Sequence, residues 1–226
     1  MKSKLLFVVV LASAGILVAQ QASAPAPVPV ESEPLHKVVF KNDVVTVMHL
    51  ILPPGERTQY HTHTHDRIAV TLSATSTTNQ KWNEAEGSAA PTKPGDIGAL
   101  TLAEASYTHR VHNVGPVAFD VLDIEPAQRP ATPSPDVAGP VAAETPSARV
   151  YNWVLAPGAT SPMHTHTRPY IIISITALNL KMSSPDGQSG SHRVKAGDFH
   201  FVEGKVSHNL SNIGANPGQI VEVELK

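Results

Sequence analysis

The sequence predicts an all-β protein built from two barrels in tandem. Short runs of β-branched and aromatic residues alternate with turn residues, and no amphipathic helix of useful length is present. The chain also repeats itself, because residues 61–63 and 164–166 both read His-Thr-His and both follow a Pro-Gly pair at the same interval. Many short strands with regular turns are typical of β-sandwiches and barrels. The repeat indicates one such unit in each half.

Residues 1–24 have the pattern of a secretory signal peptide. A basic head at residues 1–4 precedes an apolar run at residues 5–19 and a short stretch of small and polar residues. The apolar run is short for a membrane span, so we expect a secreted or periplasmic protein with no membrane contact after cleavage. An uncleaved anchor is the alternative, and the cleavage position is left open. Residues 25–36, which alternate Ala, Pro and Val, predict an extended, partly disordered arm.

The first barrel is expected at residues 37–125. Strand-like runs lie at 38–40, 44–48, 68–72, 97–102 and 119–124, each bounded by turn residues. The polar stretch 75–92 is expected to be a loop anchored by Trp82. Residues 126–146, rich in Pro, Ala and Thr, predict a linker.

The second barrel is expected at residues 147–226, where the order of turns and strand-like runs begins again. Ile171, Ile173 and Ile175 share one face of a predicted strand. That apolar face would either pack the two halves together or pair two molecules into a homodimer.

Composition excludes several classes of function. The chain has no cysteine, so disulfides, thiolate ligands and cysteine nucleophiles are absent. The formal net charge is −2 with no basic cluster, which argues against nucleic-acid binding. Histidine is abundant, with 12 residues, and this abundance indicates a chemical role for some of them.

The histidine pairs predict metal binding. Side chains two apart on a strand point the same way, so each His-Thr-His places two imidazoles on one face. A third histidine follows in each half, four residues before an asparagine. The candidate ligands are His61, His63 and His109 in the first half, and His164, His166 and His208 in the second. Imidazole suits divalent transition metals, here Fe, Zn, Ni, Cu or Mn. Three neutral ligands leave positive charge and open positions for a small anionic ligand.

These residues resemble the motifs of the cupin family. Its first motif is Gly, five residues, His-x-His, three or four residues, Glu, six residues, Gly. Gly55 and Gly158 with their histidine pairs fit its front part. Its second motif ends in His, three residues, Asn, and residues 197–212 fit its spacing. Residues 95–113 fit with a three-residue insertion.

The resemblance implies a bicupin of the cupin 2 conserved-barrel type, with two double-stranded β-helix (jelly-roll) barrels, each with a metal in its mouth. The family's motif glutamate, normally a fourth ligand, falls near Arg67 and Tyr170, and neither is a carboxylate. Both are candidate catalytic residues. An inward guanidinium about 6 Å from a divalent ion would cost roughly 5 kcal/mol at an effective dielectric near 20. We therefore expect Arg67 to turn outward, pair with Asp66 or bind the substrate's anion, and the Tyr170 hydroxyl to hold a metal-bound oxygen or donate to a substrate.

The other residues considered are not expected to bind metal or to take part in catalysis. His65 is not counted as a ligand, and His112 is expected at a rim. The remaining residues are expected to be ordinary surface, core, turn or packing residues: His36, His49, His192, His200, Asn113, Asn212, Trp82 and Trp153.

Three functions follow as hypotheses. The first is an exported metal-dependent bicupin enzyme, most simply a dioxygenase. The alternative is a non-catalytic metal or small-ligand binding protein. A weaker third option is zinc-dependent hydrolysis from a three-histidine site like that of carbonic anhydrase.

Overall fold

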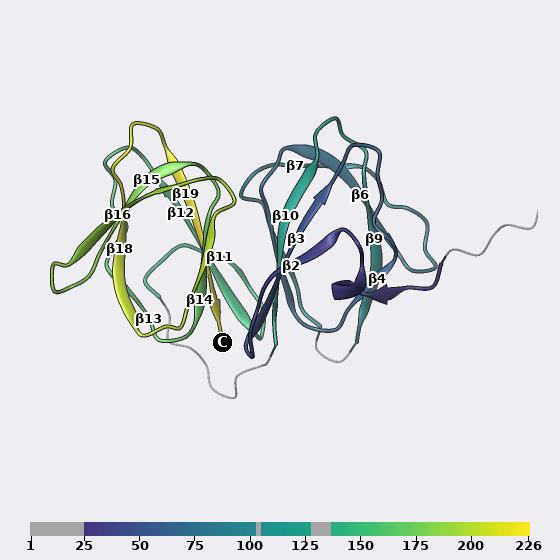
Figure 1. Ribbon diagram of the computed structural model, residues 1–226, viewed down its shortest axis with the longest axis horizontal. Coiled ribbons are helices and arrows are strands. Elements are labelled where there is room, and N and C mark those ends of the chain that lie inside the picture. The colour runs from purple at the N-terminus through teal and green to yellow at the C-terminus, as the bar shows by residue number, and fades with distance from the viewer. Residues whose placement is uncertain (1–24, 103–104, 128–136) are drawn as a thin grey trace, which may run out of the picture.

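The computed structural model describes residues 25–102, 105–127 and 137–226, which form two β-barrels side by side (Figure 1). The predicted signal peptide, 1–24, and residues 128–136 of the predicted linker lie outside the described residues. The predicted all-β fold with tandem barrels is confirmed. Among the described residues, no helix has the length and apolarity that crossing a membrane requires.

The N-terminal barrel consists of two five-stranded sheets. The first has the order β1 (Val28–Pro29), β4 (His61–His63), β9 (Tyr107–Asn113), β6 (Thr75–Lys81) and β7 (Ala90–Thr92). The second has the order β2 (His36–Lys41), β3 (Val45–Leu52), β10 (Phe119–Pro126), β5 (Arg67–Thr71) and β8 (Ile97–Leu100). The stretch 75–92, predicted to be a loop, therefore contains two strands.

The C-terminal barrel repeats this plan. One sheet has the order β11 (Val141–Glu144), β12 (Ala148–Leu155), β19 (Gly218–Leu225), β14 (Tyr170–Ser174) and β17 (Phe199–Val202). The other has the order β13 (His164–His166), β18 (Val206–Asn212), β15 (Leu178–Ser183) and β16 (Ser189–Val194). Strand β11 lies within the segment predicted as linker and pairs with β12.

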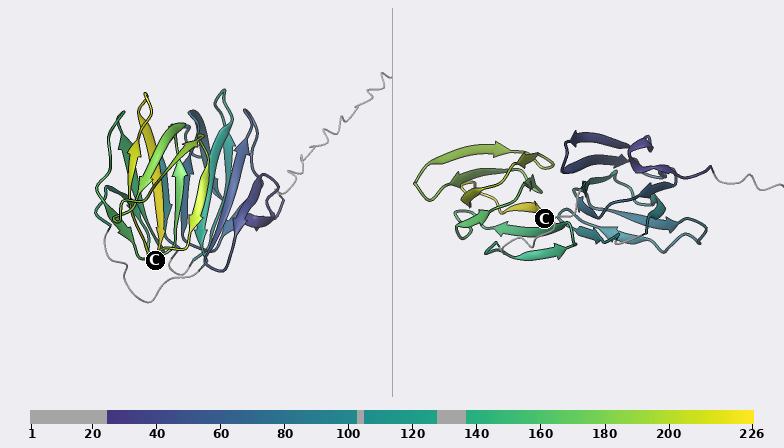
Figure 2. Two further views of the ribbon diagram at one scale, coloured as in Figure 1. Left: turned by 60° about the vertical axis from the view of Figure 1, so that its left-hand side comes forward. Right: turned by 90° about the horizontal axis from the view of Figure 1, so that it is seen from below.

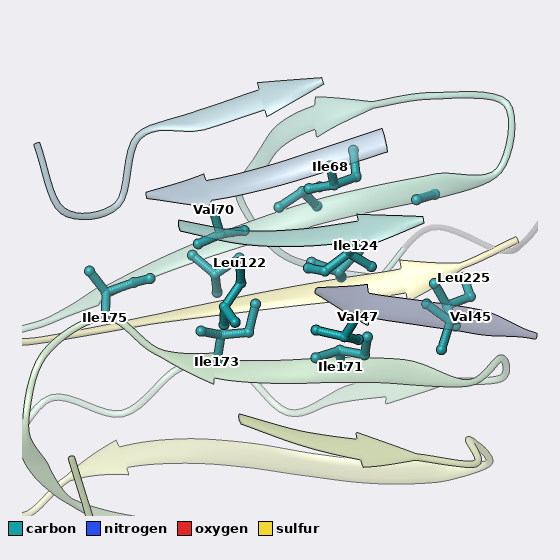
Figure 3. Close-up of a cluster of buried hydrophobic side chains, with 14 residues drawn as sticks. Val45, Val47, Ile68, Val70, Leu122, Ile124, Ile171, Ile173, Ile175 and Leu225 are labelled. Atoms are coloured by element: carbon teal, nitrogen blue, oxygen red, sulfur yellow. The ribbon is translucent and has the colours of Figure 1, made fainter. Parts of the chain in front are cut away.

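A shared apolar core joins the two barrels (Figure 3). The N-terminal barrel contributes Val45, Val47, Ile68, Val70, Leu122 and Ile124, and the C-terminal barrel contributes Ala148, Val150, Ile171, Ile173, Ile175, Val221, Val223 and Leu225. The isoleucine face of β14 thus packs the two halves together. Figure 2 shows the same side-by-side arrangement from two other directions.

The Pro-Gly turns are tied to the asparagines that follow the third histidines. Gly55 and Gly158 have φ of 79° and 77°, as the predicted turns require. Their amides donate to the carbonyls of Asn113 and Asn212, respectively. Each asparagine side chain also donates to the strand before its turn, at the carbonyl of Leu52 or of Leu155. Each repeat of the motif therefore holds its own turn in place.

The arm at residues 25–36 is ordered from Val28 onward, contrary to the expectation of partial disorder. Strand β1 pairs with β4 in parallel, and a short 3₁₀ helix, η1 (Val30–Ser32), follows. Val30 is buried, and the Glu33 carboxylate accepts the backbone amides of Leu35, His36 and Gln59. These contacts fix the arm against the barrel.

Candidate metal centres

Antiparallel pairing brings the predicted histidines of each half together. His61 lies opposite His109 in the β4–β9 pair, and His164 lies opposite His208 in the β13–β18 pair. In both pairs the ring centroids are 4.5 Å apart. The second histidine of each His-Thr-His lies two residues along the same strand and faces the same interior. Each barrel therefore contains a buried group of three imidazoles.

The C-terminal group includes a fourth residue, Glu222 of β19, which the sequence reasoning missed. Its Oε2 lies 3.2 Å from His164 Nε2 and 3.4 Å from His166 Nε2, and its Oε1 lies 3.1 Å from His208 Nε2. One ligand atom from each of the four residues lies within 4.8 Å of the others. The carboxylate absent from the first family motif is thus supplied by the last strand.

The donor atoms of this four-residue C-terminal cluster fit a metal ion. The Nδ1 atoms of His164 and His166 donate to the carbonyl of Pro162 and the carboxylate of Glu224, both at 2.9 Å, which leaves the Nε2 lone pairs free. All three Nε2 atoms and Glu222 Oε1 are buried without hydrogen-bond partners. Three imidazoles and a carboxylate form a set that suits a divalent transition metal.

The electrostatics of the C-terminal cluster also favour a cation. Burial alone would lower the pKa of His166, but Glu222 and Glu224 raise it to about 9. Burial likewise opposes ionisation of Glu222, yet its contacts with the three histidines hold its pKa well below the usual range. Without a metal, His166 therefore carries a proton at neutral pH, and a bound cation would displace that proton from Nε2.

Two aromatic residues support the cluster. Trp153 was expected only to pack, but its Nε1 donates to Glu222 Oε2 at 2.7 Å, and its ring stacks on His164. Tyr170 stacks on His166 with ring centroids 3.9 Å apart. The Tyr170 hydroxyl is buried without a hydrogen-bond partner, and burial together with Glu222 raises its pKa. Tyr170 therefore keeps its proton and has a hydroxyl to donate.

Among the hollows of the C-terminal barrel, two share Met182. The larger, about 480 Å³, has an apolar lining that includes Ile172, Leu180 and Met182. His192 and His200, expected to be ordinary, also line it. The smaller, about 280 Å³, shares Met182 and includes the ligand candidate His208. The smaller hollow thus adjoins the cluster through His208, whereas none of the four cluster residues lines the larger one.

The N-terminal group has a different electrostatic environment. Its Nδ1 atoms bond to Gln59 O (His61, 2.9 Å), Glu125 Oε1 (His63, 2.5 Å) and Asn79 Oδ1 (His109, 2.7 Å). His63 Nε2 and His109 Nε2 lie 3.0 Å apart within hydrogen-bonding geometry. Burial, with added effects from His36 and Arg67, lowers the pKa of His61 to about 4. The three ligand atoms still lie close enough together to hold an ion.

Two of the three expectations for Arg67 were wrong, and binding of a substrate anion stays a prediction. It neither turns outward nor pairs with Asp66: its Nε and Nη2 donate to Asp123 Oδ1 at 2.7 and 2.6 Å. Asp66 instead accepts from Leu102 and Ser147. Burial alone would raise the pKa of Asp123, but Arg67 and His36 hold it well below its usual range. The error arose because Asp123 was not expected to face the interior.

His36 also departs from its expected ordinary role. It is buried, its Nδ1 bonds Glu33 at 2.7 Å, and its ring lies 4.5 Å from that of His61. His65 lies outside the N-terminal group, with its Nδ1 3.8 Å from Glu125. His112 and His49 bond to Glu86 and Asp120, respectively.

Comparison with known proteins gives a consistent result. No family model matches the chain. It is 34% identical over 77 residues to the beta-alanine degradation protein BauB of Pseudomonas aeruginosa, a match that covers 34% of this chain and 80% of that protein.

Two solved structures share the fold over most of this chain. A cupin 2 conserved barrel domain protein from Leptotrichia buccalis has a TM-score of 0.54 at 10% identity, covering 84% of this chain and 88% of that one. An oxalate decarboxylase from Bacillus subtilis, whose Mn(II) centres have been characterised, has a TM-score of 0.53 at 14% identity, covering 81% and 69%.

Proposed function

Because this chain belongs to the cupin family, as a member with two barrels, we propose that its C-terminal barrel binds one divalent transition metal and acts on a small oxygen-bearing anion. His164, His166, His208 and Glu222 would hold the ion. The observation that carries this proposal is the convergence of four buried ligand atoms that lack hydrogen-bond partners. The Mn(II) centres of the structurally similar oxalate decarboxylase make Mn, beside Fe, a first metal to test.

The surrounding residues have distinct roles in this proposal. A bound redox-active metal would supply Lewis acidity and electron transfer to an oxygen-bearing substrate. Glu222 offsets part of the ion's charge and leaves a net positive centre that attracts an anion. Trp153 fixes the orientation of Glu222 through its hydrogen bond. Tyr170 donates a hydrogen bond from its protonated hydroxyl to a substrate oxygen.

The reaction class we propose is dioxygen-dependent oxidation, with the larger hollow receiving the body of the substrate. Its lining combines apolar side chains with Arg193, Asp198 and two histidines, a mixture that suits an enol or a phenol, which has an apolar body and a polar group.

The test is turnover by the metal-loaded chain. Protein loaded with Fe(II), Mn(II) or Zn(II) is given enols, catechols, flavonols and, because of the structural neighbour, oxalate. Oxygen uptake and carbon dioxide release are then measured. We expect oxygen uptake that disappears in Glu222→Ala and persists in Glu203→Ala, which changes an exposed glutamate. If no substrate gave oxygen uptake or carbon dioxide release with any of the metals, the enzymatic proposal would be refuted.

A non-catalytic metal or ligand-binding protein is the second candidate. The nearly complete burial of the four C-terminal residues favours it, because 0–3% of each is exposed. A bound ion without exchangeable water, measured by water-proton relaxation of the Mn(II) form, would support binding alone. Zinc hydrolysis is less favoured, because Glu222 adds a fourth ligand to a site that would need an open position.

Export remains part of the proposal and rests on the pattern of residues 1–24. Fractionation of bacterial cells expressing the full chain, with mass measurement of the mature N-terminus, tests it. Retention of residues 1–24 in the cytoplasmic fraction would refute it.

A further inference from the structure

The two barrels differ most where β10 and β19 face their histidines. Asp123 is the fifth residue of β10 and lies opposite Ala69 of β5. Glu222 is the fifth residue of β19 and lies opposite Ile172 of β14. The two carboxylates therefore occupy equivalent positions, yet only Glu222 belongs to a potential metal-binding group of the described residues.

We propose that the positive charge of Arg67 takes the place of a metal ion in the N-terminal barrel, so that the chain retains metal in its C-terminal barrel alone. This inference rests on the proposed metal binding by the C-terminal barrel. Arg67 and Tyr170 are the first residues of the equivalent strands β5 and β14. Tyr170 is neutral and stacks on a histidine, whereas Arg67 brings a permanent positive charge that Asp123 accepts.

Recruiting Asp123 to a metal would require breaking its contacts with Arg67. Both Arg67 hydrogen bonds go to Oδ1 of an aspartate that is fully buried. Releasing that oxygen would leave an unpaired guanidinium beside a divalent ion in a buried pocket. The shorter side chain of aspartate also lacks the methylene by which Glu222 reaches its histidines.

The N-terminal histidines also meet part of their own hydrogen-bonding needs. His63 Nε2 and His109 Nε2 are bonded to each other and His61 Nε2 lacks a partner, whereas in the C-terminal group all three Nε2 atoms lack partners. A metal in the N-terminal barrel would have to displace that contact. In the C-terminal barrel it would satisfy atoms that are otherwise unpaired.

The N-terminal arm adds further contacts that keep Asp123 from binding a metal. Strand β1 pairs with β4, which carries His61 and His63. His36 bonds Glu33 and places its Nε2 3.5 Å from Asp123 Oδ2. The other oxygen of Asp123 therefore also faces a possible cation. Asp123 therefore has Arg67 on Oδ1 and His36 near Oδ2, although Oδ2 accepts no hydrogen bond.

Metal content per chain tests this inference. The full chain is expressed with Mn, Fe or Zn in the medium, dialysed against a weak chelator and analysed by inductively coupled plasma mass spectrometry. We expect about one equivalent in the wild type, about one in His61→Ala and nearly none in His164→Ala. Circular dichroism of each variant confirms that it is folded.

A second experiment tests whether the N-terminal barrel can be given a metal site by substitution. The double variant Arg67→Tyr with Asp123→Glu places the equivalents of Tyr170 and Glu222 in the N-terminal barrel. It should raise the metal content to about two equivalents per chain. Asp123→Glu alone, which keeps Arg67, is the matched control and should remain at one. Two equivalents in the wild type, falling to one in His61→Ala, would overturn the inference and leave the proposed function standing. A wild type without metal would overturn the proposed function and this inference with it.

Discussion

Replacing Trp153 by phenylalanine removes one hydrogen bond to Glu222 while keeping an aromatic ring beside His164. The bond is 2.7 Å long and buried at both ends. A hydrogen bond to a charged group contributes about 1.5–3 kcal/mol. Loss of an outer partner of a metal ligand typically costs about 10–100-fold in metal affinity, which is about 1.4–2.8 kcal/mol.

The expected result is therefore metal binding that is about 10–100-fold weaker and a lower melting temperature of the metal-loaded protein. For a chain of this size each kcal/mol shifts the melting temperature by about 2–4 °C, which predicts a loss of about 3–12 °C. Chelator competition measures the affinity, and scanning calorimetry measures the melting temperature.

Trp82→Phe is the matched control, because Trp82 lies in the N-terminal barrel and packs edge-on against Tyr60. It should leave metal affinity unchanged. If Trp153→Phe bound metal as tightly as the wild type, the reasoning that Trp153 positions Glu222 as a ligand would be refuted.

Three further predictions concern stability. Chelation should destabilise the protein, since free metal at 100 times its Kd contributes about 2.7 kcal/mol; unchanged calorimetric melting after metal removal would count against the site. The pKa of Glu33 is lowered from 4.5 to about 2: burial opposes this shift, but hydrogen bonds to His36 and to backbone amides outweigh it. Its stabilisation of about 3 kcal/mol is thus complete above pH 4.5 and is lost as the pH falls toward 2. Glu33→Gln should remove that dependence from acid denaturation curves, and an unchanged curve would contradict it. Ile173→Ala, in the shared core, should cost about 2–5 kcal/mol in urea unfolding; a loss under 1 kcal/mol would argue against tight packing there.

The histidine trios were predictable because strand alternation and the repeat both act within short stretches of sequence. Glu222 was missed because the family motif directs attention to the residues just after each His-Thr-His. Its own signal is the alternation Val221, Glu222, Val223, Glu224, in which an interior face of a central strand carries acids. That pattern shows which residues share a face, but not which face meets the histidines.

Arg67 and the arm illustrate a different limit. The sequence singled out Arg67 but not its ion-pair partner, because Asp123 lies 56 residues away on another strand. The ordering of the arm depends on Val30 burial and on Glu33 contacting amides as far away as Gln59. Such long-range contacts are set by assembly of the barrel, whereas local composition alone suggests an extended segment.

The shared core between the barrels affects how the two halves can evolve. β10 and β19 present Leu122, Ile124, Val221 and Val223 to that core, and Asp123 and Glu222 to the barrel interiors. Because both apolar faces belong to one polypeptide, each is covered at any protein concentration, without the dissociation that threatens a pair of separate subunits. One barrel can then lose its metal site and still be retained, because it covers the apolar face of the other barrel. Tandem duplication of this kind permits a division of labour between a chemical half and a scaffolding half.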